Sequence, residues 1–485
     1  MNQLDSQIVS QVVREVIARL QTAPSATAAA PQTATPPASA TGFGVYDDMT
    51  LAVEAAHASF HQLRAGGIAA RRKAIAIIRR VCIENATEWG TIEFHETKIG
   101  RLAHKIEKLH NCANLVPGVE FLERQVYSGD HGVTVIDYAP WGLIGAITPS
   151  THSVPTLTCN AINMIAAGNS VVYNTHPAAC RIAAVAIRAY NQAIHKELGI
   201  SDLLTTVVKP TLETFDTLCN HPKVALLCIT GGPAVVAAAM KTGKRAICAG
   251  PGNPPVVIDE TADLAKAARG IIAGAAYDNN LLCIGEKEVF VVESVADALM
   301  EEFRRAGAYR LDPAQIEALA QKAFVFPQGQ GAGCPHPVVS RDLVGQDAAV
   351  LAKSIGLDIP ASVELLIGET RADHIFVQEE QMMPFVPIVR VPDVDTAIAE
   401  AFKAEHGYRH TAIIHSRNID ALTKMAQVMD TTIFVKNGSC SAGLGSGGEG
   451  FLSFSIATPT GEGVTTPMTF TRSRRCVMAE SLNMY

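Results

Sequence analysis

From about residue 143 onward, short apolar segments alternate with longer segments of helical character. Apolar segments such as "NSVVYN", "VALLCIT" and "PPVVID" alternate with helical ones such as "CRIAAVAIRAYNQAIHKEL" and "TADLAKAARGIIAGAAYD". Strands that are apolar along their whole length are buried on both faces, as in parallel sheets covered by helices. The pattern therefore predicts a doubly wound parallel α/β sheet. A second run of the same kind, from "EVFVVES" to "TTIFVKN", predicts a second α/β lobe.

The length of 485 residues allows two or three domains, and the hydrophobic content of 48% is sufficient for large cores. No apolar run in the sequence approaches the roughly 20 residues that span a bilayer. The net charge of -7, and the lack of a basic stripe with interleaved aromatic residues, argue against a nucleic-acid ligand. We therefore expect binding neither to membranes nor to nucleic acid.

The 11 cysteines are an odd number, they form no C-x-x-C pair, and no secretory signal opens the chain. These features predict free thiols in a reducing cytosol. Cys159, Cys228 and Cys248 lie in apolar surroundings, which predicts that they are small core residues. The 15 histidines include no H-E-x-x-H motif and no cysteine at ligand spacing, so no metal site is expected.

The N-terminal segment differs from the rest of the chain. In residues 1–20, apolar side chains recur at i, i+4 spacing, which predicts an amphipathic helix. Residues 21–42 are mostly Ala, Pro, Thr and Ser, which is typical of a flexible linker. A tethered apolar stripe favours docking into a groove of another protein. Docking on the body of the same chain is the main alternative, and a membrane surface is less favoured because the helix has few cations.

One cysteine has a distinctive setting. In "YDNNLLCIGEKEVFVV", Cys283 follows an apolar pair, Asn279 and Asn280 precede it, and Gly285 separates it from a predicted strand. This places the thiol at the end of a loop. A thiolate becomes reactive where dipoles or cations lower its pKa and a cleft exposes it. From this window alone, a core cysteine is the simpler explanation and a nucleophile is the alternative.

Two glycine-rich segments could bind phosphate. In "VALLCITGGPAVVAAAM", a buried strand ends in Thr230, Gly231 and Gly232, and Pro233 suits the first turn of the following helix. Exposed N–H groups and the helix dipole favour phosphate there, although an ordinary strand-to-helix turn explains the pattern equally well. The G-x-G-x-x-G match in "GLGSGG" has no helical pattern after it, so we reject it as a dinucleotide site.

Taken together, several segments resemble the aldehyde dehydrogenase superfamily, in particular its CoA-acylating branch from bacterial microcompartments. The resemblance covers residues 43–485 and rests on "GLIGAITPSTHSVPT", "ITGGPAVV", "AGPGNPPVVIDETAD", "DNNLLCIGEKEV", "EEQMMPFVPIVRV" and the long segment that begins "AGLGSGGEGF". It implies oxidation of a short aliphatic aldehyde, propionaldehyde before acetaldehyde or lactaldehyde, with NAD and coenzyme A. The tethered helix resembles the encapsulation peptide of that group.

The resemblance also implies roles for individual residues. Cys283 falls on the catalytic nucleophile, and Thr151 and His152 fall where the family places its side-chain oxyanion donor. Hydrolytic members have Asn at that place, and Thr151 together with the Cys283 N–H is the expected donor pair here. The nucleophile would attack the aldehyde carbon and carry the acyl group as a thioester.

Cofactor contacts are implied in the same way. Thr230, Gly231 and Gly232 fall on the turn that meets the cofactor phosphates, and Glu380 falls on the residue that holds the nicotinamide ribose. Asn174 stands where the family usually has a Lys that binds the adenosine ribose, so the choice between NAD and NADP stays open.

The absence of one carboxylate suggests which molecule accepts the acyl group. Hydrolytic members carry a Glu that activates water in the segment corresponding to "ICAGPGNPP", whereas residues 246–255 contain no carboxylate. Without a general base, water is a poor nucleophile toward a thioester. A thiol ionises more readily, so the sequence favours transfer to coenzyme A over release of a free acid. A non-catalytic shell-interaction subunit is the rival of another class.

The sequence and the resemblance together predict five segments along the chain. They are a targeting helix, a linker, a cofactor-binding domain, a catalytic domain, and a C-terminal segment that returns to the cofactor domain; the ranges are 1–20, 21–42, 43–262, 263–445 and 446–485. Family members assemble through a β-hairpin, here 122–138, and a C-terminal strand. We therefore expect a homodimer or homotetramer, in the cytoplasm and inside a microcompartment whose shell protein binds residues 1–20.

Overall fold

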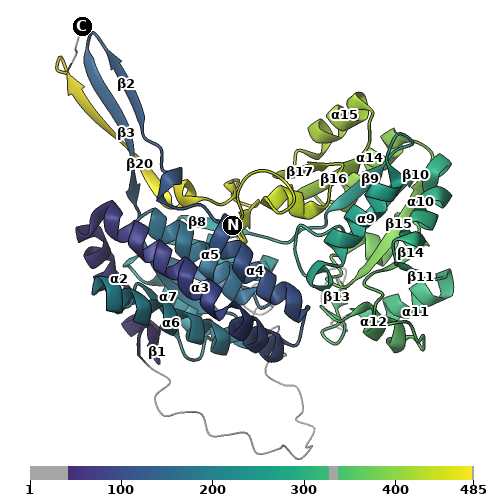
Figure 1. Cartoon of the computed structure of the whole chain (residues 1–485), viewed down its shortest axis with the longest axis horizontal. Helices are drawn as coiled ribbons and strands as arrows, with labels where there is room; N and C mark the ends of the chain where they lie inside the picture. Colours follow the sequence, from purple (N-terminus) through teal and green to yellow (C-terminus); the bar gives the residue numbers. More distant parts are fainter. Residues whose placement is uncertain (1–41, 327–336, 483–485) are drawn as a thin grey trace, which may run out of the picture.

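The computed structural model describes residues 42–326 and 337–482, which form two α/β lobes and a projecting β arm (Figure 1). Each lobe is built on a parallel sheet, as the alternation of apolar and helical segments predicts. The predicted helix 1–20, and the predicted linker up to residue 41, lie outside the described residues. No helix within 42–326 or 337–482 is long and apolar enough to cross a membrane.

The first lobe contains a six-stranded sheet with the order β1-β6-β5-β4-β7-β8, and all its strand pairs are parallel. Every residue of the central strands β4, β5 and β6 is buried, including the polar residues of β5 and β6. The strands are β1 (Val45–Tyr46), β4 (Leu143–Thr148), β5 (Ser170–Thr175), β6 (Leu204–Val207), β7 (Val224–Thr230) and β8 (Ala246–Ala249).

Two layers of helices cover the faces of this sheet. Because side chains alternate along a strand, Ile144 of β4 packs in one apolar cluster and Leu143 in the other. The first cluster includes residues of α3 (Gly67–Thr97), α4 (Leu102–Leu115), α5 (Ser153–Ala166) and α6 (Cys180–Leu198). The second includes residues of α2 (Met49–Ala65), α7 (Leu212–Asn220) and α8 (Pro233–Met240). All 14 residues of α5 are buried, so this helix lies at the centre of the lobe.

The second lobe contains a seven-stranded parallel sheet with the order β11-β14-β15-β10-β9-β16-β17. Its strands are β9 (Pro255–Ile258), β10 (Glu288–Val292), β11 (Tyr309–Arg310), β14 (Leu366–Thr370), β15 (Phe385–Val391), β16 (Thr411–His415) and β17 (Ile433–Lys436). Its helices are α9 (Leu264–Ala275), α10 (Glu293–Arg305), α11 (Pro313–Ala323), α12 (Ala348–Ser354), α13 (Ile375–Gln378), α14 (Val394–Ala404) and α15 (Ile419–Met429).

The position of β9 differs from the sequence-based division of the chain. The predicted range 43–262 assigned this strand to the first lobe, but β9 pairs with β10 and β16 in the second sheet. Strand partners are set by long-range hydrogen bonding, which local apolar character does not encode. The chain therefore crosses between the lobes in the segment between β8 and β9.

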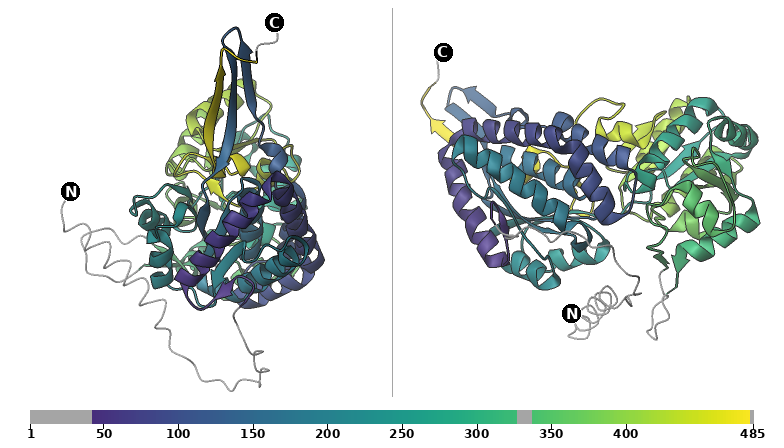
Figure 2. Two further views of the ribbon diagram at one scale, coloured as in Figure 1. Left: turned by 90° about the vertical axis from the view of Figure 1, so that its left-hand side faces the viewer. Right: turned by 60° about the horizontal axis from the view of Figure 1, so that its bottom comes forward.

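The arm is a three-stranded antiparallel sheet of β2 (Gln125–Gly129), β3 (Gly132–Pro140) and β20 (Thr471–Ala479), and it extends away from both lobes (Figures 1 and 2). The hairpin predicted at 122–138 is present, with β3 continuing to Pro140. Strand β20 pairs with β3 along its whole length, from Thr471 to Ala479. Apolar side chains on the arm are exposed: Val126 61%, Tyr127 59% and Val477 57%.

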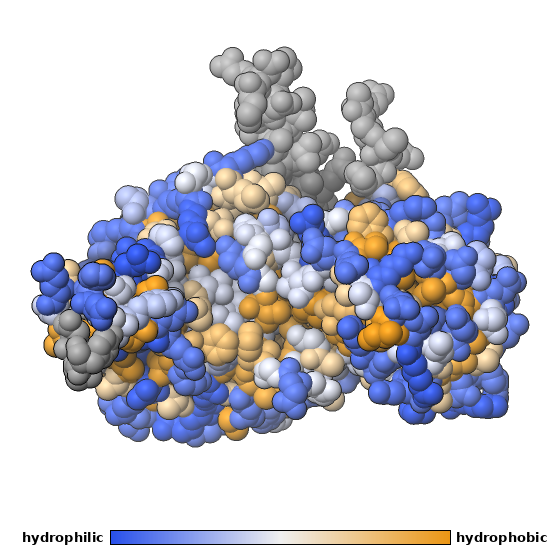
Figure 3. Space-filling view, turned by 90° about the horizontal axis from the view of Figure 1, so that it is seen from above, coloured by the Kyte–Doolittle hydropathy of each residue, from blue (hydrophilic) through white to orange (hydrophobic). Residues whose placement is uncertain are grey.

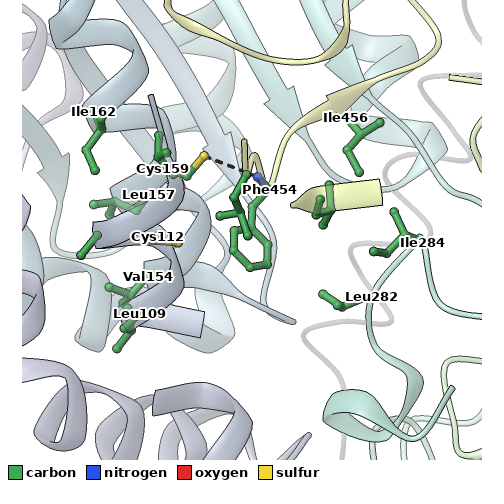
Figure 4. Packing of buried hydrophobic residues seen from close by; sticks show 14 of the residues in the cluster. Leu109, Cys112, Val154, Leu157, Cys159, Ile162, Leu282, Ile284, Phe454 and Ile456 are labelled. Carbon is green, nitrogen blue, oxygen red and sulfur yellow. Dashed lines mark hydrogen bonds between the residues drawn. The ribbon is translucent and has the colours of Figure 1, made fainter. Parts of the chain in front are cut away.

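The segment before β20 crosses the first lobe on the side of α5. The Phe454 N–H donates to Cys159 Sγ at 3.4 Å, and the Phe454 ring lies beside this helix (Figure 4). The short elements here are β18 (Ile456–Ala457), β19 (Gly463–Val464) and η5 (Pro467–Phe470). Cys159, Cys228 and Cys248 are fully or almost fully buried, which confirms the prediction that they are core residues.

Candidate active site

The candidate nucleophile lies in a loop that leads into β10. Cys283 precedes this strand, as the sequence predicts, and it packs against the large apolar cluster that extends through both lobes. Burial raises the pKa of the Cys283 thiol to about 12; the nearby Glu380 carboxylate also raises it, and the Lys287 ammonium opposes the rise. The thiol is therefore protonated at neutral pH in this state of the protein.

The backbone before the thiol has an unusual shape. Asp278, Asn279 and Asn280 have consecutive positive φ values of 49°, 57° and 62°. Asp and Asn tolerate this left-handed conformation better than other non-glycine residues. Their side chains also fix it, since Asn279 Nδ2 donates to the Gly345 carbonyl at 2.9 Å and Asn280 Oδ1 accepts from Lys287 Nζ at 2.6 Å. Hydrogen bonds to other segments of the chain thus fix the loop from 278 to 283, which is here called the thiol loop.

Other residues close to Cys283 precede neighbouring strands of the second sheet. Gly252 precedes β9, Glu380 precedes β15 and His410 precedes β16. An added methyl group at Gly252 would lie 2.6 Å from the Cys283 carbonyl oxygen and 2.9 Å from the His410 ring. The Gly252 N–H also donates to the Glu380 carboxylate. Because the strands are parallel, these residues meet at the amino edge of the sheet.

A buried cation accompanies the thiol. The Lys287 side chain is fully buried, and its Nζ lies 4.0 Å from Glu380 Oε1. Burial lowers the pKa of Lys287, while Glu380 and the Cys283 thiol raise it. Burial also raises the pKa of Glu380, which Lys287 opposes. Burial, with a smaller effect of Lys287, lowers the pKa of His410 to about 4, so this imidazole is neutral at neutral pH.

Thr151 and His152 lie between β4 and α5 in the first lobe. The Thr151 carbonyl accepts a hydrogen bond from Lys105 Nζ at 2.6 Å. The His152 ring is buried, with its centroid 5.4 Å from that of Phe454. Burial lowers the pKa of His152 well below its usual value, and Lys108 lowers it further. A neutral imidazole at this place can donate one hydrogen bond without carrying a charge.

The proposed phosphate and ribose contacts lie at the carboxyl edge of the first sheet. Thr230 ends β7, and Gly232 is the N-cap residue of α8, with Pro233 at its first position, as predicted. An added methyl group at Gly232 would meet no atom within 4 Å, so a phosphate can approach the helix N-terminus. The Thr230 hydroxyl lies 2.8 Å from the Ser455 hydroxyl, which links this turn to the C-terminal segment.

Asn174 lies near the end of β5 at the same edge, and it is only 7% exposed. Its Oδ1 accepts from the Thr214 hydroxyl at 2.7 Å, and its Nδ2 donates to the Thr211 carbonyl at 3.4 Å. Both polar atoms of the Asn174 amide are therefore hydrogen-bonded to residues at the start of α7. The glycine turn fits a dinucleotide phosphate, whereas the Asn174 side chain would need to exchange these bonds before it could hold a ribose.

Side chains from both lobes line a pocket next to the thiol loop. Leu282 and Ile284, which flank Cys283, line it together with Phe454 from the C-terminal segment and Lys108 from α4. In Figure 4, Leu282 and Ile284 lie on one side of Phe454, and Val154 and Leu157 of α5 lie on the other. Apolar side chains also gather between the two lobes on the face seen in Figure 3. The pocket is small, about 30 Å³, and one Asn and two Ser side chains also line it, so its walls are both apolar and polar.

A model of the aldehyde dehydrogenase family matches residues 23–315. The acetaldehyde dehydrogenase (acetylating) EutE of Escherichia coli is 45% identical to the chain over 485 residues, which cover 100% of both proteins. This chain belongs to the aldehyde dehydrogenase family.

Solved structures of family members share the fold. The propionaldehyde dehydrogenase of Rhodopseudomonas palustris, with bound propionyl-CoA, superposes with a TM-score of 0.88 and 43% identity, covering 92% of this chain and 98% of that one. The propionaldehyde dehydrogenase from the fucose utilisation bacterial microcompartment of Clostridium phytofermentans has a TM-score of 0.88 and 42% identity, covering 92% and 100%. The expected two-lobed aldehyde dehydrogenase fold with its arm is thereby confirmed.

The structure adds residues that the sequence analysis did not select. The most prominent are Lys287, Gly252 and His410 beside the thiol, and a group of buried charges around Lys105 and Lys108. A signal for the last group existed, because both lysines occupy the apolar stripe of α4 with Leu109 and Cys112 at helical spacing. No group of three or more potential metal ligands occurs in the part of the chain that the structure describes.

Proposed function

We propose that this protein is a CoA-acylating aldehyde dehydrogenase, which converts a short aliphatic aldehyde, NAD and coenzyme A into acyl-CoA and NADH. The observation that carries the proposal is the surroundings of Cys283. Its carbonyl contacts Gly252, in a turn that contains no carboxylate to activate water. Lys287 stands next to the thiol and favours its ionised form.

The chain's own residues supply the covalent steps. Cys283 gives up its proton to solvent water, and its sulfur bonds to the aldehyde carbon, so that the electron pair of the carbonyl bond moves to the oxygen, which becomes an oxyanion. The Cys283 N–H and the Thr151 hydroxyl are the donors we assign to this oxygen. NAD, when bound, accepts the hydride from this carbon. The resulting thioester on Cys283 is attacked by the thiolate of coenzyme A, the carbon–sulfur bond to Cys283 breaks, and acyl-CoA leaves.

We assign the cofactor contacts to both lobes. Thr230, Gly231 and Gly232 would meet the phosphates, Glu380 would hold the nicotinamide ribose, and Asn174 would face the adenosine ribose. The open approach to Gly232 supports the first assignment. The position of Glu380 near Cys283 supports the second, because hydride transfer requires the nicotinamide close to the sulfur-bound carbon.

Propionaldehyde is our first choice of substrate, with acetaldehyde next. Leu282, Ile284 and Phe454 place apolar side chains beside the thiol loop, and the pocket that they help to line is only about 30 Å³, which favours a short aliphatic chain over a long one. Relatives of this chain are a propionaldehyde dehydrogenase with bound propionyl-CoA and an acetylating acetaldehyde dehydrogenase. Comparison of kcat/KM across aldehydes of one to six carbons tests this choice, and a maximum at five or six carbons would contradict it.

The reaction type is tested by following NADH with and without coenzyme A. With aldehyde and NAD alone, we expect one NADH per active site and then no further turnover, because the thioester on Cys283 persists. Addition of coenzyme A should restore steady turnover and yield acyl-CoA. Absence of NADH under both conditions would contradict an enzymatic role and favour a non-catalytic subunit.

A hydrolytic aldehyde dehydrogenase is the second candidate, because one carboxylate does lie near the thiol. Burial raises the pKa of Glu380, so a proton could be taken up there. Under this alternative, free acid would form steadily without coenzyme A, and Glu380→Gln would abolish that reaction. Under our proposal, Glu380→Gln mainly raises the KM for NAD.

We also propose the organisation of the whole protein. The cofactor-binding domain would extend from residue 43 to the crossing between β8 and β9, and the catalytic domain from there to about residue 445. The segment 446–485 would return to the first lobe and complete the arm. The exposed apolar side chains of the arm support assembly as a homodimer or homotetramer. Light scattering of the protein, compared with Val477→Glu, tests this assembly.

Residues 1–20 are proposed to bind a microcompartment shell protein, with 21–42 as tether, and the protein would thus lie inside a compartment in the cytoplasm. The microcompartment origin of the Clostridium phytofermentans relative supports this location. Deletion of 1–42 should leave specific activity nearly unchanged while abolishing copurification with shells. A truncated protein that still enters shells, or that loses activity, would contradict the proposal.

A further inference from the structure

Four charged side chains form a fully buried group between the two lobes. The members of this charged cluster are Glu93 of α3, Lys105 and Lys108 of α4, and Asp278 of the thiol loop, each at most 1% exposed. Lys108 Nζ lies 2.5 Å from Asp278 Oδ2. Lys105 Nζ lies 3.7 Å from the same oxygen and 3.4 Å from Glu93 Oε1. Two positive and two negative charges balance one another.

Stability alone does not account for this cluster. Removing charges from water costs several kcal/mol per ion, and replacement of a buried ion pair by apolar side chains is often neutral or stabilising. Lys105 and Lys108 occupy the stripe of α4 that otherwise buries Leu109 and Cys112, where apolar residues would serve packing equally well. We therefore expect the four charges to have a role besides stabilising the fold.

One end of the charged cluster holds the segment of the candidate oxyanion donor. Lys105 Nζ donates to the Thr151 carbonyl at 2.6 Å. Glu93 Oε2 accepts from the Val154 N–H in the first turn of α5 at 3.2 Å. The backbone on either side of His152 is thus fixed by two members of the cluster.

The other end holds the start of the thiol loop. Asp278 Oδ1 accepts from the Arg101 N–H at 2.9 Å, and the Asp278 N–H donates to His104 Nδ1 at 2.9 Å. Asp278 is also the first of the three left-handed residues that lead to Cys283. Its carboxylate packs against Gly100, where an added methyl group would lie 2.2 Å from Oδ1. These two hydrogen bonds and this close contact hold Asp278 in place.

We propose that the charged cluster is a positioning device that sets the placement of Thr151 relative to Cys283. Its four residues act as positioning residues; Lys108, which also lines the pocket beside the thiol loop, acts through its ion pair with Asp278. The inference rests on the proposed function, since the placement matters only if Thr151 and Cys283 act on the same carbonyl group. A displacement of about 1 Å between such groups can lower a rate about 100-fold.

A charge-balanced variant separates positioning from simple charge pairing. Lys108→Met together with Asp278→Asn removes one positive and one negative charge, and it leaves Lys105 and Glu93 paired. Arg390→Met is the control, because Arg390 forms an ion pair with Glu369 in the second sheet, outside the thiol loop. All variants are made in the full chain.

Two measurements are made on each variant. The first is the single-turnover rate of NADH formation with NAD and propionaldehyde. The second is the alkylation rate of Cys283 by iodoacetamide in the cofactor-free protein, followed by peptide mass spectrometry. The buried thiols of Cys112 and Cys159 serve as internal monitors of general unfolding.

For the double variant we expect the single-turnover rate to fall about 100-fold. The alkylation rate of Cys283 should rise about tenfold, because a released loop exposes the thiol. Cys112 and Cys159 should stay as unreactive as in the wild type, and Arg390→Met should keep both rates within about twofold of wild type, as is usual for changes away from a site.

A wild-type single-turnover rate in the double variant would overturn the proposal. So would a slow rate accompanied by fast alkylation of Cys112 and Cys159, which indicates a role in folding only. If the double variant does not fold, Glu93→Gln replaces it, with an expected fall of about tenfold, and a wild-type rate again overturns the proposal. If the wild type forms no NADH, the proposed function fails, while the alkylation rates still test the cluster.

Discussion

The thiol loop (residues 278–283) and the glycine turn (residues 230–233) both join secondary-structure elements, but their surroundings are opposite. Next to the thiol loop, one added methyl group at Gly252 would lie 2.6 Å from the Cys283 carbonyl oxygen. At the glycine turn, an added methyl group at Gly232 would meet no atom within 4 Å. The contrast suggests that the backbone carrying a reacting atom is fixed on all sides, whereas the turn that receives a ligand is left open.

The two regions also differ in charge. Around the thiol loop, the side chains of Lys287, Asp278 and His410 are buried, and their pKa values are shifted by burial and by nearby charged groups. The glycine turn offers backbone N–H groups and the Thr230 hydroxyl, which is bonded to Ser455. Neither kind of group titrates near neutral pH. We therefore expect the conformation of the thiol loop to respond to pH and to small changes in packing. The conformation of the glycine turn should respond to neither of these changes.

The largest effect is expected from Cys283→Ala. The substitution removes the only sulfur of the chain that we place in the reaction, so turnover and the acyl-enzyme should fall below detection. The thermal unfolding midpoint should change little, because the substitution removes a single sulfur atom. The measurements are NADH formation and intact-mass detection of the acyl group. Cys248→Ala is the matched control, and a variant pair in which it alone loses activity would contradict the assignment.

Gly252→Ala should give the second largest effect. The new methyl group would overlap the Cys283 carbonyl oxygen, and overpacking of this kind costs about 1–3 kcal/mol of stability. The accompanying shift of the loop should lower kcat about 100-fold. Urea unfolding and steady-state kinetics measure the two effects. A variant with wild-type kcat would show that the thiol loop tolerates displacement, and the contrast with the glycine turn would then fail.

The third largest difference between the two regions is expected in the pH dependence of stability. The pKa of His410 is lowered to about 4 in the folded protein, against about 6.5 when unfolded. The unfolded chain therefore binds more protons between these values, so stability is present above pH 6.5 and is lost as pH falls toward 4. At pH 5 the loss from this group is about 2 kcal/mol relative to pH 7.

Urea unfolding of the wild type and His410→Gln at pH 7 and pH 5 measures this contribution. The variant should lose about 2 kcal/mol less stability than the wild type between the two pH values. His131→Gln, on the exposed arm, should behave as the wild type does. An equal loss in the wild type and His410→Gln would show that His410 is not the group that takes up the proton.

Gly232→Ala should have the smallest effect on the fold. The backbone there has φ -66° and ψ 168°, which alanine adopts without strain, and the space beside it is open. Stability should therefore stay within about 0.5 kcal/mol of wild type. The KM for NAD should rise several-fold with kcat unchanged, because the methyl group narrows the approach of a phosphate. A large loss of stability would remove the contrast between the two regions.

Much of the architecture follows from the sequence by itself. Strand β5 is buried at every position and helix α6 has a clear apolar face, so their alternation is visible in local periodicity. The loop position of Cys283 and the start of α8 at Pro233 also follow from neighbouring residues, because turn chemistry acts over a few positions. The family resemblance likewise depends on short segments of sequence.

Only the tertiary structure decided which distant segments meet. Strand β9 has the same apolar pattern as the strands of the first sheet, yet it pairs in the second, because its partners lie far along the chain. Lys105 and Lys108 stand out as charges in an apolar stripe, but Asp278, their partner, is 170 residues beyond Lys108. Likewise, contact between Gly252 and Cys283 arises because β9 and β10 are neighbours. Local periodicity shows whether a side chain is buried, whereas the long-range packing of helices and strands determines which residues that side chain contacts.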